Sequence, residues 1–251
     1  MLAAAYLQAA LERTDEASHW LVLPTPDAQD AADDAHLAEA VLALQPDVLG
    51  VTLYLWNVER TLRLVRRLRR RLPGLHVIAG GPEVARHHPF LFRGKALDTV
   101  VMGEGEDLIA PVLCAAREGR TTNWARVAHR THRFRWGERP TPANGLASLL
   151  PPPDHPVNRP DARGMAYLET TRGCPMHCAF CCYNQRRDDV SALPPGDVER
   201  RIEVLRERGA REIRLIDPTF NAVASFRETL RALQRANADG VLAVFLELRA
   251  D

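Results

Sequence analysis

Four of the five cysteines in the chain lie within nine positions, in the stretch TTRGCPMHCAFCCYN. Cys174, Cys178 and Cys181 have the spacing C-x3-C-x2-C, and Cys182 follows directly. Thiols this close together could form a disulfide staple, a zinc site, an iron–sulfur site or a redox pair.

The spacing favours an iron–sulfur cluster with one open iron. Three thiolates on one short loop can each bind a different iron of a cubane cluster, and the fourth iron can then bind a small chelating molecule. Zinc would need a fourth ligand from Cys182 or His177, and the adjacent pair Cys181 and Cys182 is poorly placed to bind one ion. A thioredoxin-like pair normally lies at a helix N-terminus without a third cysteine nearby. Zinc and redox chemistry stay as alternatives, and Cys182 and His177 are interpreted as bystanders.

Composition and charge restrict the classes of protein to consider. Of the 251 residues, 46% are hydrophobic and 26% charged, as in a globular protein able to bury a core. A formal net charge of +1 gives no reason to expect nucleic acid or an anionic membrane as partner. The longest apolar run, 48–56, is too short to span a bilayer, and the N-terminus lacks the basic start of a signal peptide. We expect a cytoplasmic, reducing location, where clustered cysteines are more often metal ligands than disulfides.

Strand-like and helix-like segments alternate through the first part of the chain. Strands are expected in HWLVLP (19–24), PDVLGVTLYLW (46–56), LHVIAGGPE (75–83) and the start of 97–119. Helices are expected near the N-terminus, in 34–45, in 57–74 and at the end of 97–119, with Asp34 and Asn57 as N-caps. This alternation predicts a Rossmann-like, doubly wound α/β domain with a parallel sheet over residues 1–119.

A proline-rich segment and a second alternating pattern follow. Seven of the 18 prolines lie between Pro140 and Pro160, so residues 120–163 are expected to form an extended connector. Residues 164–251 read as strand, cysteine loop, helix, strand, helix and strand. The cysteine loop would therefore lie at the C-terminal end of a parallel sheet, where the active sites of α/β barrels are found.

The stretch ETTRGCPMHCAFCCYN resembles the cluster loop of radical S-adenosylmethionine (SAM) enzymes, including the aromatic residue before the third cysteine. The resemblance implies that Cys174, Cys178 and Cys181 ligate a [4Fe–4S] cluster that binds SAM and, once reduced, cleaves it to a 5′-deoxyadenosyl radical. It also implies that residues 164–251 form the first half of a partial TIM barrel, with about three βα units. The cofactor-binding residues that it implies are Phe180, Asp217, Thr219, Asn221 and Glu247, with Arg249 and Asp251 as further candidates on the third strand. An ordinary charged strand end is the alternative for the residues of that strand.

Three segments of the first domain, GVTLYLWN, AGGPEV and MGEGED, each follow a strand and lead toward a helix. Glycines let a backbone approach a large ligand, and helix N-termini favour polar or anionic groups. The order of the segments ahead of the cysteine loop resembles the cobalamin-binding domain of B12-dependent radical SAM enzymes. The likeness implies a corrinoid pocket lined by Thr52, Tyr54, Trp56, Asn57, Gly80, Gly81, Pro82, Glu83, Gly103, Glu104, Gly105 and Glu106. The alternative is that these loops merely turn the chain.

The D-x-H-x-x-G motif, whose histidine ligates cobalt in many cobalamin proteins, is only imitated here. Asp34 and His36 match its start, but Glu39 stands where the glycine should be. Asp34 is interpreted as a helix N-cap and His36 as a surface residue. The lower ligand of the cobalt is therefore left without a candidate.

Taken together, the resemblance implies a cobalamin-dependent radical SAM methyltransferase acting on an unactivated centre of a small molecule or peptide. One SAM would methylate cobalamin, a second would generate the radical, and flavodoxin or ferredoxin would supply electrons. The alternatives are a cobalamin-using radical SAM oxidoreductase or cyclase, and an inactive corrinoid- or cluster-binding fragment. The family's partial barrel usually has six strands and this sequence predicts three, so the chain is interpreted as a truncated member.

Overall fold

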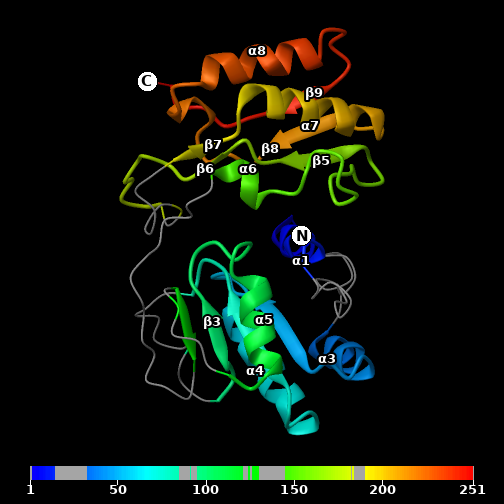
Figure 1. Ribbon diagram of the computed structural model, residues 1–251, viewed down its shortest axis with the longest axis vertical. Coiled ribbons are helices and arrows are strands. Elements are labelled where there is room, and N and C mark those ends of the chain that lie inside the picture. Colours follow the sequence, from blue (N-terminus) through cyan, green and yellow to red (C-terminus); the bar gives the residue numbers. More distant parts are fainter. Residues whose placement is uncertain are drawn as a thin grey trace. The chain divides into compact units, whose positions relative to one another are not determined.

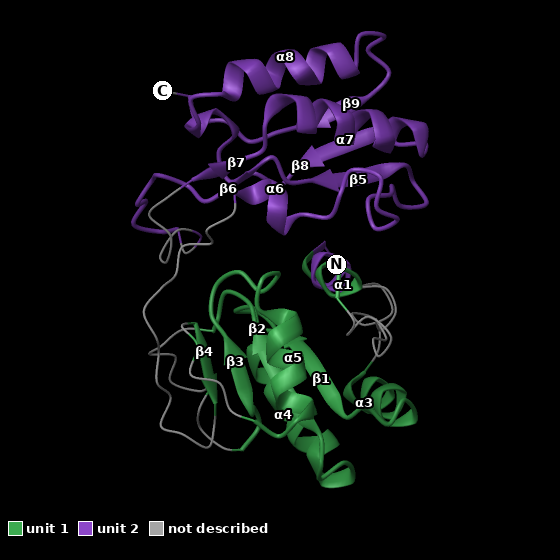
Figure 2. Cartoon of the chain, in the orientation of Figure 1, with its two compact units in different colours: residues 1, 3, 10–141 green, residues 2, 4–9, 142–251 purple. Residues whose placement is uncertain are grey.

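The computed structural model describes residues 2–14, 33–84, 91, 95–120, 124, 126–129, 145–181, 183 and 190–250 (Figure 1). The chain divides into two compact units, shown in Figure 2. The first unit holds residues 1, 3 and 10–141, and the second holds residues 2, 4–9 and 142–251. Each unit has its own sheet and its own hydrophobic core. The predicted boundaries at 119 and 164 stay predictions.

The first unit is built on a sheet with the strand order β1-β2-β3-β4. Three parallel strands, β1 (Val48–Thr52), β2 (His76–Gly80) and β3 (Thr99–Val101), are joined at the edge by the antiparallel β4 (Val127–His129). Its helices are α3 (Asp34–Ala43), α4 (Val58–Arg71) and α5 (Ile109–Arg117). The parallel strand–helix alternation confirms the predicted fold class, whereas the antiparallel edge strand was not predicted.

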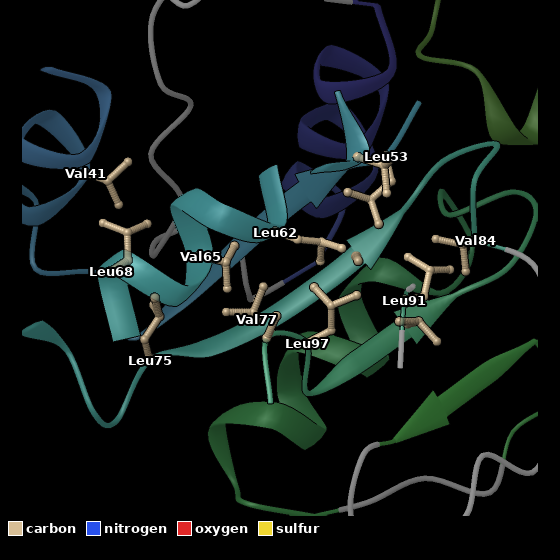
Figure 3. Packing of buried hydrophobic residues seen from close by; sticks show 14 of the residues in the cluster. Val41, Leu53, Leu62, Val65, Leu68, Leu75, Val77, Val84, Leu91 and Leu97 are labelled. Atoms are coloured by element: carbon tan, nitrogen blue, oxygen red, sulfur yellow. The ribbon is translucent and has the colours of Figure 1, made fainter. Parts of the chain in front are cut away.

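Both faces of this sheet are covered by helices. Val77 and Ala79 of β2 pack in a cluster that includes residues of α3 and α4, and Figure 3 shows Val65 of α4 next to Val77. Ile78, which lies between them in sequence, packs instead in a second cluster with Val112 of α5. Successive side chains of a strand point to opposite faces, so a strand covered on both sides reads as a continuous apolar run.

The start of α3 differs in detail from the prediction. The carboxylate of Asp33 accepts a hydrogen bond from the His36 amide at 2.7 Å, so Asp33 caps α3 and the predicted Asp34 cap is wrong by one residue. Asp34 is the first helical residue, and its side chain pairs with Arg60. Two neighbouring aspartates had the same capping chemistry, and the extended backbone of Asp33 decides between them. His36 is exposed, as expected.

The second unit contains a parallel sheet with the strand order β5-β8-β9. Its strands are β5 (Met165–Leu168), β8 (Glu212–Leu215) and β9 (Ala243–Phe245), and the helices between them are α7 (Pro195–Glu207) and α8 (Phe226–Ala236). The smaller elements are α6 (Leu146–Leu149), the antiparallel pair β6 (Thr171–Arg172) and β7 (Ser191–Ala192), and the 3-10 turn η2 (Phe220–Ala222). The residues of helix α1 (Leu2–Glu12) are divided between the two units. Three parallel strands with connecting helices are the arrangement predicted for this part of the chain.

Among the described residues, one face of this second sheet packs against helices and the other carries exposed side chains. Ala166 and Leu168 of β5 belong to a core that includes residues of α7 and α8, whereas Tyr167 between them is exposed. On the same face as Tyr167, the guanidinium of Arg214 lies 5.7 Å from the ring centre of Phe245, which is also exposed. The sheet therefore presents an open face with aromatic side chains beside a helix-covered one.

The range 120–163 is not wholly extended. β4 belongs to the sheet of the first unit, and Leu146 and Leu150, at the two ends of α6, are buried in the core of the second. The expectation of a connector without packed elements is wrong at these positions. The predicted strand at 19–24 lies outside the described residues. Within the described part of the chain, no helix is both long and apolar enough to cross a membrane.

Candidate functional site

The cysteine loop starts from the C-terminal end of β5 and is closed at its base by a short ladder. Thr171 and Arg172 of β6 pair with Ala192 and Ser191 of β7. The Leu193 amide adds a hydrogen bond of 2.8 Å to the Thr170 carbonyl. The two ends of the loop are thereby held together, next to the parallel sheet. The loop lies at the sheet edge where we expected a cofactor.

The three cysteines differ in exposure. Cys174 is only 8% exposed, whereas Cys178 and Cys181 are exposed. The Cys181 amide donates to the Cys178 carbonyl at 3.0 Å, and the Tyr183 amide donates to the sulfur of Cys181 at 3.4 Å. An amide pointed at a sulfur stabilises the negative charge of a thiolate ligand. All three are free thiols in the structure, so the donor set for a cluster is present.

No group of three His, Cys, Asp or Glu side chains among the described residues converges on a point that could hold a single metal ion. A cubane cluster does not require such convergence, because each thiolate binds a different iron. Cys182, interpreted above as a bystander, lies outside the described residues. His177 and Phe180 are both exposed, and Phe180 at 90% has the most exposed large apolar side chain described.

The segment after β8 reaches the first cysteine. The hydroxyl of Thr219 lies 3.6 Å from the sulfur of Cys174, although the two residues are 45 positions apart. The same hydroxyl donates a hydrogen bond of 2.6 Å to the carbonyl of Pro218. The structure therefore brings the predicted Thr219 to the predicted cluster ligand.

Asp217 is buried and bound to the chain that leads into the cysteine loop. Its carboxylate accepts hydrogen bonds from the amides of Thr170 at 2.7 Å and Thr171 at 3.0 Å, and from the Thr170 hydroxyl. Burial raises the pKa of Asp217 above its ordinary value, and the hydrogen bonds from Thr170 and Thr171 partly oppose that shift. This carboxylate, predicted to lie near the methionine moiety of SAM, holds the start of the cysteine loop in place.

Asn221 makes the corresponding connection to the segment after β9. The prediction that Glu247 and Arg249 lie on the third strand is wrong, because β9 ends at Phe245, and Asp251 lies outside the described residues. Its side-chain amide donates to the Arg249 carbonyl at 3.0 Å and accepts from the Arg249 amide at 2.9 Å. The amide of Phe220 donates to the carbonyl of Glu247 at 2.9 Å, and the Glu247 side chain is exposed. The segment 217–221 therefore ties the end of the central strand β8 to the strand ends on both sides. Direct cofactor contacts by Asp217, Asn221 and Glu247 stay predictions.

A buried ion pair at the start of the loop was missed in the sequence. Both guanidinium nitrogens of Arg172 that face Glu169 donate to its carboxylate, at 2.8 and 2.7 Å. The pair is largely buried, and its two residues lie three positions apart, with Arg172 immediately before Gly173. An acidic and a basic residue three positions apart are common on solvated surfaces, so the sequence alone gave no reason to single them out.

In the first unit, the loop after β1 is fixed by Asn57. Its side chain accepts from the Tyr54 amide at 2.8 Å and donates to the Thr52 carbonyl at 3.1 Å, and it makes no capping bond to α4. The rings of Tyr54 and Trp56 stack with their centres 4.6 Å apart, and Trp56 is 79% exposed. The loop thus presents a flat aromatic surface, of the kind that can pack against a planar macrocycle.

The loop after β2 lies tightly on the end of β1. Leu53 donates to the Gly80 carbonyl at 2.8 Å and accepts from the Glu83 amide at 3.1 Å. Gly81 has a φ of +102°, and a Cβ at this position would lie 2.6 Å from the Leu53 carbonyl oxygen. Only glycine fits here, because the backbone conformation and the close approach both exclude a side chain. Pro82 is exposed on the same turn.

The loop after β3 leads into α5 and is held by a residue that the sequence did not reveal. Gly103 has a φ of +81°, and the Gly105 carbonyl accepts from the amide of Ile109 at 2.8 Å. The buried Arg126 donates to the Glu104 carbonyl at 2.8 Å and to the carboxylate of Asp107. The Glu106 side chain accepts from the Gly105 amide at 3.1 Å. No local pattern marks Arg126, since its partners lie 19 and 22 positions earlier.

The loops after β1, β2 and β3, of which the last two contain glycines, follow neighbouring parallel strands. The carboxyl ends of parallel strands meet at one edge of the sheet, so these loops gather there. Their exposed aromatic surface, glycine backbone and helix starts suit a large flat ligand with polar edges.

Comparison with known families is decisive for both units. The family model of the B12 binding domain matches residues 2–113, which include the loops after β1, β2 and β3. The model of the Radical SAM superfamily matches residues 168–249, which include the three cysteines and the segment after β8. The chain therefore has the domain order of the B12-binding radical SAM enzymes. The predicted family, and with it the expectation of cobalamin and of a [4Fe–4S] cluster with SAM as the family's cofactors, is confirmed.

Two curated relatives of this B12-binding radical SAM chain are named as methyltransferases. The 2-(S-pantetheinyl)-carbapenam-3-carboxylate methyltransferase of Streptantibioticus cattleyicolor is 32% identical over 212 residues, which are 77% of this chain and 30% of that protein. The cobalamin-dependent radical SAM methyltransferase TokK of Streptomyces tokunonensis is 27% identical over 218 residues, 78% of this chain and 31% of that protein. The chain therefore spans less than a third of the length of these relatives.

A solved structure has the same fold as this B12-binding radical SAM chain. The radical SAM methyltransferase TsrM from Kitasatospora setae, solved with tryptophan and a SAM analogue, matches with a TM-score of 0.65 and 17% identity. The match covers 95% of this chain and 51% of that one. The predicted order of a cobalamin-type sheet followed by radical SAM strands is thereby confirmed.

Proposed function

We propose that this chain provides the cofactor-binding part of a cobalamin-dependent radical SAM methyltransferase acting on an unactivated centre. The observation that carries the proposal is the C-x3-C-x2-C loop, closed by β6 and β7 at the carboxyl ends of parallel strands and fixed there by Asp217. The names of the relatives support methyl transfer over other radical SAM reactions.

Each part of the chain has a defined task in this proposal. Cys174, Cys178 and Cys181 would hold the cluster, and the loops after β1, β2 and β3 would hold the corrinoid. Bound in these places, the cluster would supply the electron that cleaves SAM, and cobalamin would carry the methyl group. Thr219, 3.6 Å from Cys174, fixes the side of the loop nearest to β8.

The substrate we propose is a small organic molecule. One similar protein is named for a pantetheinyl carbapenam carboxylate, and the structure of TsrM was solved with tryptophan as substrate. The nearly neutral chain gives no electrostatic reason to expect nucleic acid. A flavodoxin or ferredoxin is the proposed electron donor, in a reducing compartment that keeps the cysteines as thiols.

The proposal is tested by anaerobic reconstitution of the chain with iron, sulfide and hydroxocobalamin, followed by SAM and dithionite. We expect a brown protein that forms 5′-deoxyadenosine and S-adenosylhomocysteine, the products of SAM cleavage and of methyl donation. Formation of 5′-deoxyadenosine without S-adenosylhomocysteine would support a radical SAM enzyme that does not transfer methyl groups. A colourless protein that purifies with zinc would contradict the cluster.

Three cysteine variants test the ligand set, and a fourth is their matched control. Replacing Cys174, Cys178 or Cys181 by serine is expected to abolish iron and sulfide binding and 5′-deoxyadenosine formation, because a three-thiolate site has no spare ligand. Cys114→Ser, in α5 of the first unit, should leave both at the level of the unmodified chain. Iron binding that survives loss of one of the three thiols would exclude this ligand set.

A further inference from the structure

Arg126 combines burial, charge and an unfavourable backbone conformation. It directly precedes β4, is 5% exposed and has a φ of +69°. A residue other than glycine in this left-handed region is strained and persists only where its surroundings hold it. A buried guanidinium also needs a carboxylate or carbonyl partners. Both costs indicate that the surrounding contacts determine its position.

Those contacts all lead to the loop between β3 and α5. Arg126 donates from Nη1 to the Glu104 carbonyl at 2.8 Å and from Nη2 to the carboxylate of Asp107. Its own carbonyl accepts a hydrogen bond of 2.8 Å from the Met102 amide. The side chain and backbone of Arg126 thus contact the chain at Met102, Glu104 and Asp107, which lie before, within and after the loop.

Gly103 and the turn into α5 show how the rest of this loop is built. A Cβ built on Gly103 would meet no atom within 4 Å, so no neighbouring side chain packs against this point. The turn into α5 is closed by backbone bonds from Leu108 and Ile109 to the Gly105 carbonyl. The guanidinium is therefore one contact from outside the loop that acts on the peptide unit formed by the Glu104 carbonyl and the Gly105 amide.

We propose that Arg126 is a positioning residue for cobalamin, acting through the loop Gly103–Glu106 rather than by touching the ligand. The inference rests on the proposed function, since it assumes that this loop lines the corrinoid site. A fork of two donors is needed, because one nitrogen holds the carbonyl and the other the carboxylate. A lysine keeps the charge but donates from a single nitrogen, so it lacks the fixed fork that spans the two acceptors.

The test compares Arg126→Lys, Asp107→Asn and the double variant with the unmodified chain. Hydroxocobalamin affinity is measured by absorbance titration at a temperature where circular dichroism shows each variant to be folded. Amide hydrogen exchange of the peptide covering 102–108 is measured without cobalamin. The matched control is Arg120→Gln, which removes an exposed arginine paired with Glu118 in the same unit.

We expect Arg126→Lys to bind hydroxocobalamin about tenfold more weakly, since one charged hydrogen bond contributes about that factor. Asp107→Asn should weaken binding in the same direction, and the double variant should bind about as well as Arg126→Lys alone, because both changes break one interaction. Exchange in 102–108 should be faster in both single variants and unchanged in Arg120→Gln.

Equal affinity of Arg126→Lys and the unmodified chain, or unchanged loop exchange, would overturn the role of Arg126 and leave the proposed function intact. An unmodified chain that does not bind hydroxocobalamin would instead overturn the proposed function at this site. Where Arg126→Lys does not fold, Asp107→Asn decides, because its carboxylate is a third exposed and its loss is milder.

Discussion

The carboxylate of Asp217 accepts a hydrogen bond of 2.7 Å from the amide of Thr170, 47 positions earlier in the chain. Both residues are buried, and Thr170 is four positions before the first cysteine of the cluster loop. The contact fixes the end of β5 to the end of β8 at the point where the loop begins. A residue of one strand end thus sets the geometry of a site carried by another.

Replacing Asp217 by alanine should destabilise the second unit by about 2–5 kcal/mol, because the buried amides of Thr170 and Thr171 would lose their acceptor. Urea unfolding followed by circular dichroism measures the change. Asp239→Asn, which weakens an exposed pair with Arg206, is the control and should cost less than about 1 kcal/mol. A similar effect of both variants would mean that the Asp217 contacts are not what stabilises the loop start.

The same carboxylate should make stability depend on pH. Burial raises the pKa of Asp217 in the folded chain, so the folded state holds this proton more tightly than the unfolded state. Its contribution to the free energy of unfolding is therefore greatest below the ordinary pKa of aspartate and is lost as pH rises through the raised value. Asp217→Asn carries no such proton. The free energy of unfolding of the unmodified chain minus that of Asp217→Asn should fall between acid and neutral pH. A difference that grows with pH would contradict a raised pKa of the buried Asp217 carboxyl.

Three glycines of the first unit form a graded test of the loop geometry. Gly81→Ala should cost about 2–4 kcal/mol, since it adds both a left-handed strain and a clash with the Leu53 backbone. Gly103→Ala adds the strain without the clash and should cost about 1–2 kcal/mol. Gly50→Ala, in β1 with open space and ordinary φ, is the control and should be nearly neutral. Thermal unfolding gives the order, and equal effects at all three positions would contradict it.

Trp56→Ala should weaken hydroxocobalamin binding by about tenfold and leave thermal stability almost unchanged. The indole is 79% exposed in the structure, so its removal costs the folded chain little beyond the stack on Tyr54. Burial of the ring against the corrin would supply the binding energy. Trp124→Ala, which removes another exposed indole of the same unit, should bind hydroxocobalamin normally. Unchanged affinity in Trp56→Ala would remove this residue from the proposed pocket.

The parts of the site that depend on neighbours in sequence were predictable. The three cysteines and the glycine-containing loops are local patterns, because ligand spacing and turn geometry are encoded within a few residues. Asp217 was predicted as a site residue, but its bonds to Thr170 and Thr171 depend on the pairing of β5 with β8, which no local pattern specifies.

The unpredicted parts depend on contacts across the fold. β4 has three residues, too few for a periodicity, and it forms because β3 offers an edge. Arg126 binds Glu104 and Asp107, which lie in the loop after β3 and far from it in sequence. Its burial and left-handed backbone could therefore not be predicted from neighbouring residues. The shift of the α3 cap from Asp34 to Asp33 reflects a choice between two chemically identical side chains.

The pairing of Thr170 with Asp217 has a consequence for protein synthesis. A ribosome adds Cys174, Cys178 and Cys181 before it adds Asp217 or Thr219, and in the described sheet β5 pairs only with β8. On a nascent chain that ends before β8, the cysteines are already present while the strand and the carboxylate that anchor their loop are not. Delivery of iron and sulfide to an anchored site therefore has to follow translation of β8.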